Sequence, residues 1–117
     1  MGAKVVHFEI IGKDGEGLKK FFGELFDWEI DSNNPINYGM VASEEGGIGG
    51  GIGSVMKDGA RGHATFYVEV EDVQESLDKA QKLGGKISVP ETVIPDMVTF
   101  GLFTDPEGNL VGLVKSE

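Results

Sequence analysis

The sequence repeats itself at an offset of 58 residues, and this repeat constrains the fold more than any single motif. Asp14 opens an amphipathic stretch and is echoed by Asp72, while Phe8 in the preceding run is echoed by Phe66. Each copy reads as a strand, a helix and then short strands. An internal repeat of this kind predicts two similar half-modules, neither of which would bury enough apolar surface alone.

Periodicity and turn signals locate the elements of each copy. In the first copy we expect strands over 5–11, 36–42 and 48–56 and a further strand starting at 28–30. We also expect a helix with the apolar stripe Leu18, Phe21, Phe22, Leu25 and Phe26. In the second copy we expect strands over 64–70, 86–89, 98–103 and 110–114, and a helix over 73–83. Asp14 and Asp72 should cap the two helices. The stripe should pack in the core, and residues 90–96 should form a loop, either a lid or a simple connection.

The first strand of each copy should have one helix-facing side and one polar side. Side chains alternate between the two faces of a strand. The helix-facing set is then Val6, Phe8 and Ile10, echoed by Phe66, Val68 and Val70. The opposite face carries His7, Glu9 and Ile11, echoed by Thr65, Tyr67 and Glu69, with His63 one step further. Polar and ionisable groups on that face should line a hollow.

Length and charge narrow the class of protein. The 117 residues suit a single domain over 1–117, with one module at about 4–57, a second at about 62–115 and a link over 57–62. There is no cysteine, which excludes disulfides and thiolate metal sites. The net charge of −10 disfavours nucleic acid and anionic membranes as partners. With no apolar run of membrane length and no leader sequence, we expect a cytoplasmic protein.

Six segments carry a resemblance to a known family. They are Val-Val-His-Phe-Glu-Ile at 5–10, Phe-Phe-Gly-Glu-Leu-Phe-Asp-Trp-Glu at 21–29, Gly-Gly-Ile-Gly-Gly-Gly at 46–51, Phe-Tyr-Val-Glu-Val-Glu-Asp-Val at 66–73, Leu-Gly-Gly-Lys at 83–86 and Phe-Thr-Asp-Pro-Glu-Gly-Asn at 103–109. Together they resemble the vicinal oxygen chelate superfamily, which contains glyoxalase I, bleomycin-resistance proteins and extradiol dioxygenases. The resemblance implies an α+β fold of two tandem βαβββ modules, with curved mixed sheets and helices on the convex side. It also implies a homodimer and ligand cups on the concave faces.

The metal site that the resemblance implies is incomplete. Metal-dependent members take His or Glu ligands from the first and last strands of their modules. His7 stands at the first of these positions, but its echo is Thr65 and the last-strand position is Gly112. We therefore expect no cofactor. A divalent metal (Zn, Ni, Fe or Mn) stays open only through a rearranged site centred on His7.

Without a metal, the same residues suit acid–base chemistry or ligand recognition. His7, Glu9, Tyr67 and Glu69 are the predicted catalytic cluster, because carboxylates and a histidine in one hollow shift each other's pKa values. The predicted ligand-binding residues are His63, Thr65, Met40, Gly50, Phe100 and Gly112. Tyr38 is expected only as an apolar wall. The glycine run at 46–53 lacks nucleotide-loop spacing and instead favours close backbone approach.

Two functions from different classes follow from this pattern. The first is a glyoxalase- or bleomycin-resistance-like protein that binds a small organic molecule in a cup between the modules, without the usual complete metal site. The alternative is a metal-dependent lyase, isomerase or dioxygenase with a rearranged site centred on His7. The sequence leaves open whether any reaction is catalysed. A non-catalytic interaction module whose dimer cup is empty is a third interpretation. Separately, His7 and Glu9 could be solvated residues on an open sheet face or contribute to a subunit contact.

Overall fold

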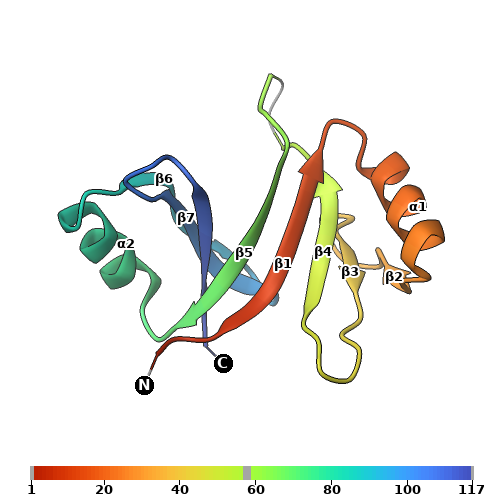
Figure 1. The fold of residues 1–117 in the computed structure, drawn as a ribbon, viewed down its shortest axis with the longest axis horizontal. Coiled ribbons are helices and arrows are strands. Elements are labelled where there is room, and N and C mark those ends of the chain that lie inside the picture. Colours follow the sequence, from red (N-terminus) through yellow and green to blue (C-terminus); the bar gives the residue numbers. More distant parts are fainter. Residues whose placement is uncertain (1, 57–58, 117) are drawn as a thin grey trace. The chain divides into compact units, whose positions relative to one another are not determined.

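The computed structural model describes residues 2–56 and 59–116, and this part of the chain contains eight strands and two helices (Figure 1). In chain order they are β1 (Val5–Gly12), α1 (Gly15–Phe26), β2 (Ile30–Asp31), β3 (Gly39–Val41), β4 (Gly49–Ser54), β5 (His63–Val70), α2 (Val73–Lys82), β6 (Lys86–Ile94), β7 (Val98–Thr104) and β8 (Leu110–Lys115). The order strand, helix and three strands occurs twice, so the predicted α+β class and its βαβββ repeat are confirmed. Of the predicted link over 57–62, residues 57 and 58 lie outside the described residues.

The chain divides into two compact units. One unit runs from His7 to Ala64, and the other joins the N-terminal residues up to Val6 with the chain from Thr65 onward. We call them the first unit and the second unit, and we call the sheet face opposite the helix of each unit its inner face. The predicted module boundaries stay a prediction.

In the first unit the strand order is β2-β3-β4-β1, with β1 parallel to β4 and β3 antiparallel to β4. The register places Phe8 opposite Gly50, and a Cβ on that glycine would overlap the Phe8 ring. On the same side the ring centroids of Phe8 and Trp28 lie 5.2 Å apart, and those of Phe22 and Trp28 lie 5.9 Å apart. Phe8 therefore faces the helix as predicted, and an aromatic stack joins β1 to α1.

Both helices begin at the predicted aspartates. The Asp14 carboxylate accepts a hydrogen bond from the Gly17 amide at 2.9 Å, and Asp72 accepts one from the Glu75 amide at 3.0 Å. These bonds satisfy amide groups that a helix start leaves without partners. The first helix ends at Asp27, whose φ of 57° lies in the left-handed region. Neither helix in the described part of the chain has the length and apolar character of a membrane-spanning segment.

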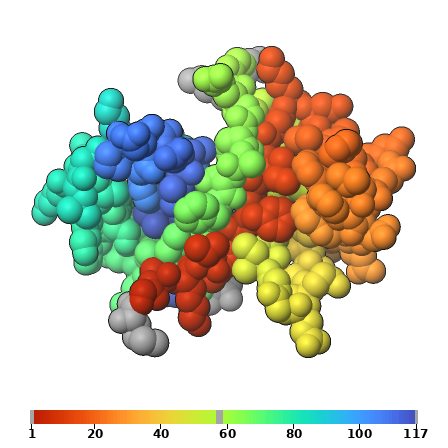
Figure 2. Space-filling view, in the orientation of Figure 1, coloured from red at the N-terminus to blue at the C-terminus, as the bar shows by residue number. Residues whose placement is uncertain are grey.

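The apolar stripe of α1 is only partly in the core, which corrects the expectation for three of its five residues. Phe21, Leu25 and Phe26 are 58%, 57% and 52% exposed. Figure 2 shows residues of α1, coloured orange, at the surface of this unit. The buried residues of the helix are instead Gly15 and Lys19. Spacing identified an apolar stripe correctly, but the sheet of this unit leaves part of the stripe uncovered.

In the second unit the strand order is β5-β8-β7-β6, and α2 packs against β6, β7 and β8. Val73 and Leu77 of α2 are fully buried and meet Leu113 of β8. Val68 and Val70 pack against this cluster, so they face the helix as predicted. The hairpin expected across residues 105–109 forms between β7 and β8.

The predicted loop over 90–96 is wrong for most of its length. Strand β6 runs through Pro90 to Ile94 and pairs with β7, with register shifts between Ile87 and Val89 and between Val89 and Thr92. Proline lacks an amide donor, so it is confined to edge strands and irregular positions of a sheet. Strand β6 is the edge of its unit and carries such an irregularity at Pro90. Two prolines thus mark a bulged edge strand and a turn after it.

Candidate functional site: a hydrogen-bonded network on the inner face of the first unit

Four side chains of the first unit form one hydrogen-bonded chain. The Tyr38 hydroxyl donates to Glu9 Oε2 at 2.9 Å and lies 2.9 Å from His7 Nε2. The second oxygen of the carboxylate, Glu9 Oε1, lies 2.9 Å from His63 Nε2. We call His7, Tyr38, Glu9 and His63 the four-residue network. It joins three of the predicted site residues, His7, Glu9 and His63, to Tyr38, which the sequence predicted only as an apolar wall.

Alternation along β1 explains how two network residues share one face. His7 and Glu9 are separated by Phe8, which points to the helix, so they point to the inner face. Glu9 is largely covered, with 12% of its side chain exposed, and the His63 side chain is 25% exposed. The network is therefore accessible from its His63 end and sheltered at its carboxylate.

The glycines of β4 make room for the tyrosine. Gly51 lies opposite Glu9 in the register, and a Cβ at Gly51 would overlap the Tyr38 ring. Any side chain at Gly51 would push the phenol away from Glu9. Close approach, the expected purpose of the glycine run, is thus realised by a side chain of the same unit. The neighbouring Gly50 serves the other face in the same way, beneath Phe8.

Tyr38 is the network residue that the sequence did not predict as part of the site. It lies just before the short strand β3, and the sequence there predicted only an apolar wall. Alternation along the sequence could place Tyr38 and Met40 on one face, but the pairing of Met40 with Gly51 is known only from the structure. A large polar aromatic aimed at a glycine was readable only once the strand register was known.

The hydrogen-bond directions follow from the chemistry of the groups. A carboxylate only accepts, so both Tyr38 and His63 donate to Glu9. With its proton committed to Glu9, the Tyr38 oxygen accepts from His7 Nε2–H. Burial lowers the pKa of His7 below its ordinary value of 6.5, and the opposing attraction of Glu9 is the smaller effect. His7 is therefore a neutral imidazole near neutral pH, able to take up a proton.

The donor set does not fit a metal ion. Among residues 2–56 and 59–116, no group of three or more His, Cys, Asp or Glu side chains converges as metal ligands. Within the network, each Glu9 oxygen is already hydrogen-bonded, and His7 is separated from Glu9 by the tyrosine hydroxyl. A shared ion needs ligand atoms about 2.1 Å from one centre.

The other predicted residues of the second unit lie on its own inner face. Tyr67 pairs with Gly112, and a Cβ at Gly112 would overlap the Tyr67 ring. Glu69 pairs with Val114, which in turn pairs with Phe100. The Thr65 hydroxyl donates to the Leu110 carbonyl at 2.5 Å. Since paired residues share a face, Thr65, Tyr67, Glu69, Phe100 and Gly112 form one inner-face set.

Met40 and Gly50 are the remaining predicted residues of the first unit. Met40 pairs with Gly51 and is 42% exposed, so it borders the network on the inner face. Gly50 lies under the Phe8 ring on the helix face, and the glycine next to the network is Gly51. The ligand-binding roles of both residues stay predictions.

Comparison with known proteins agrees with this architecture. A protein of Mycobacterium bovis named "Putative glyoxylase CFP32" is 33% identical over 106 residues, which cover 86% of this chain and 41% of that protein. The chain thus spans less than half the length of this curated relative. Among solved structures, hypothetical protein BH1468 from Bacillus halodurans matches with a TM-score of 0.69 at 10% identity, covering 100% of this chain and 96% of the other.

A second solved structure carries a functional name. Methylmalonyl-CoA epimerase of Streptomyces coelicolor matches with a TM-score of 0.61 at 14% identity, and the match covers 97% of both chains. At this identity the likeness shows a shared fold. The family assignment comes from the sequence itself, which matches the family model over residues 4–113. The chain therefore belongs to the Glyoxalase/Bleomycin resistance protein/Dioxygenase superfamily.

Proposed function

We propose that this protein binds a small polar organic molecule at the four-residue network and that it does so without a metal ion. The observation that carries the proposal is the connected chain from His7 through Tyr38 and Glu9 to His63. Satisfied polar networks of this kind hold their side chains in fixed orientations. A fixed set of donors and acceptors is what selective recognition of a polar ligand requires.

The charge of the network favours a ligand with a cationic or hydrogen-donating group. Glu9 supplies a carboxylate, and the chain as a whole carries a net charge of −10. A ligand cation near Glu9 would gain from both, most strongly where water is partly excluded. The proposal includes contact of the ligand with the inner face of the second unit, because the predicted cup lies between the two modules.

The alternative is catalysis by the same groups. A neutral His7 next to a tyrosine and a carboxylate suits proton transfer beside a carbonyl. The metal-dependent version of this alternative would need a rearranged site centred on His7. Metal content separates the two versions: protein purified without chelator and assayed for Zn, Ni, Fe and Mn should carry less than stoichiometric ion. Stoichiometric metal that is lost in His7→Ala would replace our proposal.

Ligand binding is tested by NMR titration with named probes. Metal-free bleomycin is the cationic probe, methylmalonyl-CoA the anionic one, and a library of cationic and neutral fragments extends the search. Binding should shift the amide signals of Gly51 and Tyr38, and Tyr38→Phe should weaken the affinity about tenfold. A ligand at 100 times its Kd should also raise the free energy of unfolding by about 2.7 kcal/mol.

The matched control is Glu24→Gln, which removes a carboxylate from an exposed position of α1. It should leave probe affinity unchanged within twofold. Probes that bind with equal affinity to wild type and Tyr38→Phe would contradict the proposed site, as would a library whose hits all map away from Gly51.

The proposal includes a homodimer in the cytoplasm, as the resemblance and the composition suggest. Light scattering coupled to size-exclusion chromatography measures the mass in solution. A mass of about twice the 12.5 kDa chain is expected. A mass of one chain would contradict the dimer and leave the network proposal standing.

A further inference from the structure

A lysine is buried beneath the helix of the first unit, where an apolar residue would be usual. Lys19 of α1 is 9% exposed. Its ammonium donates to Glu16 Oε2 at 2.7 Å and to the Asn37 carbonyl at 2.8 Å. Lysine is among the residue types least often buried, because desolvating its charge is costly unless it is paired. The burial of this charged side chain therefore calls for a structural explanation.

The partners of Lys19 lead directly to Tyr38. The accepting carbonyl belongs to Asn37, the residue before Tyr38, and the Asn37 side chain donates to Glu16 Oε2 at 3.1 Å. Glu16 therefore accepts from both Lys19 and Asn37, and these hydrogen bonds, that from Lys19 first, lower the pKa of the Glu16 carboxyl. One carboxylate and one ammonium thus tie α1 to the backbone beside the network tyrosine.

The segment before Tyr38 is held from its other side as well. The Asn34 side chain donates to the Tyr38 carbonyl at 2.6 Å and accepts from the Tyr38 amide at 2.9 Å. Asn37 has a φ of 54°, in the left-handed region that asparagine tolerates. A short irregular segment with a residue in this conformation needs surrounding contacts to hold it. Asn34 supplies contacts within the segment, and Lys19 supplies the link to α1.

The space around Lys19 shows that the fit is close. A Cβ at Gly39 would lie 2.9 Å from Lys19 Cε and 2.7 Å from a methyl group of Ile30. The residue after Tyr38 therefore has to be small for the lysine stem to pass. Glycine at 39 makes room for the lysine, and glycine at 51 makes room for the tyrosine.

We infer that Lys19 is a positioning residue: through Asn37 it fixes residues 32–38 so that the Tyr38 ring lies over Gly51 and its hydroxyl reaches Glu9 and His7. Lys19 itself lies on the helix side and does not belong to the network. The effect on ligand affinity rests on the proposed function. The positioning itself does not, because it is a property of the ligand-free protein.

The test measures the position of the Tyr38 ring in ligand-free protein. An aromatic ring packed on a glycine shifts the NMR signals of its Hα protons, so Gly51 reports on Tyr38 while Gly50, under Phe8, reports on the helix face of the same strand. In Lys19→Met the stem is kept and the ammonium is removed. We expect the Gly51 Hα shifts to lose at least half of their ring-current displacement and those of Gly50 to stay unchanged.

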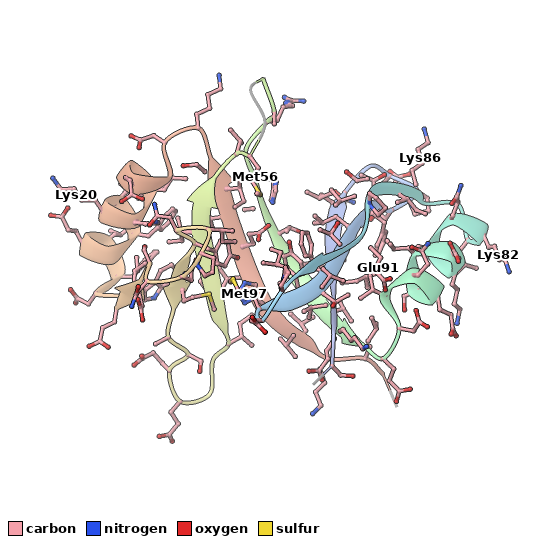
Figure 3. All side chains as sticks on the ribbon, turned by 180° about the vertical axis from the view of Figure 1, so that it is seen from behind. Lys20, Met56, Lys82, Lys86, Glu91 and Met97 are labelled. Carbon is pink, nitrogen blue, oxygen red and sulfur yellow. The ribbon has the colours of Figure 1, made fainter. Side chains whose placement is uncertain are left out.

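The matched control is Lys20→Met, on the same helix. Lys20 is exposed and projects away from α1 into solvent (Figure 3). Lys20→Met removes the same charge as Lys19→Met, so a long-range electrostatic effect on the network would be shared by both variants. Lys20→Met should leave the Gly51 shifts at their wild-type values. Where a probe binds, Lys19→Met should weaken its affinity about tenfold and Lys20→Met less than twofold.

A second variant keeps the inference testable if Lys19→Met fails to fold. Glu16→Gln replaces the carboxylate that accepts from Lys19 and Asn37 with a neutral amide. The Glu16 side chain is 71% exposed. The Glu16→Gln variant should move the Gly51 shifts in the same direction, by a smaller amount, whereas Glu24→Gln should not. Unchanged Gly51 shifts in every folded variant would overturn the positioning role. Changed shifts without any probe binding would uphold it and count against the proposed function.

Discussion

The two units share the same order of elements, but their helices contribute different side chains to the buried layer. In the second unit α2 sets Val73 and Leu77, both fully buried, against Leu113. In the first unit the buried residues of α1 are a glycine and Lys19, while the outer apolar residues of the helix stay more than half exposed. The helix of the second unit contributes aliphatic side chains to its core, whereas in the first unit the buried aliphatic residues, Ile52 and Val41, come from strands and the helix contributes an aromatic ring and a lysine.

The inner faces differ in the same direction. Glu9 and Tyr67 occupy equivalent positions of the repeat, and each lies opposite a glycine, Gly51 or Gly112. In both units a tyrosine ring covers that glycine. In the second unit the ring is that of Tyr67 itself, which is 6% exposed; in the first it arrives from outside the strand pair and meets a carboxylate. The position opposite the covered glycine therefore holds a carboxylate in the first unit and the tyrosine itself in the second.

The largest expected effect is a difference in lost stability between substitutions in the two helices. Leu77→Ala should lower the free energy of unfolding by about 2–5 kcal/mol, because it leaves a cavity in a fully buried site. Leu25→Ala, on the exposed side of α1, should cost about 1 kcal/mol or less. Urea unfolding monitored by circular dichroism measures both. Equal losses would mean that the outer face of α1 is covered in solution, and the contrast between the units would be lost.

The glycines under the tyrosines give the next effect. Gly51→Ala and Gly112→Ala should each lower the free energy of unfolding by about 1–3 kcal/mol, because the added methyl group displaces a ring. Gly47→Ala is the matched control, since a Cβ there would come no closer than 3.5 Å to its nearest neighbour, the Glu44 carbonyl oxygen. Thermal and urea unfolding measure the three variants. A Gly51→Ala variant as stable as Gly47→Ala would show that Tyr38 does not lie where the structure places it.

Removing one hydroxyl from each unit sharpens the comparison of inner faces. Tyr38→Phe breaks the hydrogen bonds to Glu9 and His7 and should lower the free energy of unfolding by about 1–2 kcal/mol. Thr65→Val breaks the short bond to the Leu110 carbonyl and a long contact of 3.5 Å to the Phe66 carbonyl, and should cost about half as much. Urea unfolding at neutral pH compares them. A larger loss for Thr65→Val would show that the network contributes little to the stability of the first unit.

The smallest effect is a pH dependence confined to the first unit. Burial holds the pKa of His7 below 6.5, so between that lowered value and 6.5 the unfolded chain binds more protons than the folded one. The free energy of unfolding should therefore fall as pH drops below 6.5 and level off once His7 is protonated in both states. Urea unfolding between pH ~5 and ~8 measures this slope.

The control for this pH dependence is His7→Gln, which removes the titrating group and keeps a hydrogen-bonding side chain. Its stability should vary less over the same window. An unchanged slope in His7→Gln would assign the pH dependence to other groups and contradict the burial of His7.

The amino-acid sequence alone determined the fold and predicted three of the four network residues, His7, Glu9 and His63. The offset between Asp14 and Asp72 located both helix starts, because capping is a local interaction between residues three apart. Alternation placed His7 and Glu9 on one face for the same reason. Local rules failed at Pro90–Ile94, where pairing with β7 outweighs the preference of proline for loops.

Only the tertiary structure decided what completes the site. Tyr38 is 29 residues from Glu9 along the chain, and their contact depends on the register of β3 and β4, on two glycines and on Lys19 beneath the helix. The spacing of apolar residues likewise marked Phe21 and Leu25 as one stripe but not how much surface lies beneath it. Periodicity is a property of neighbouring residues, whereas register and cover arise from which strands pair, and that is settled only when the whole unit has folded.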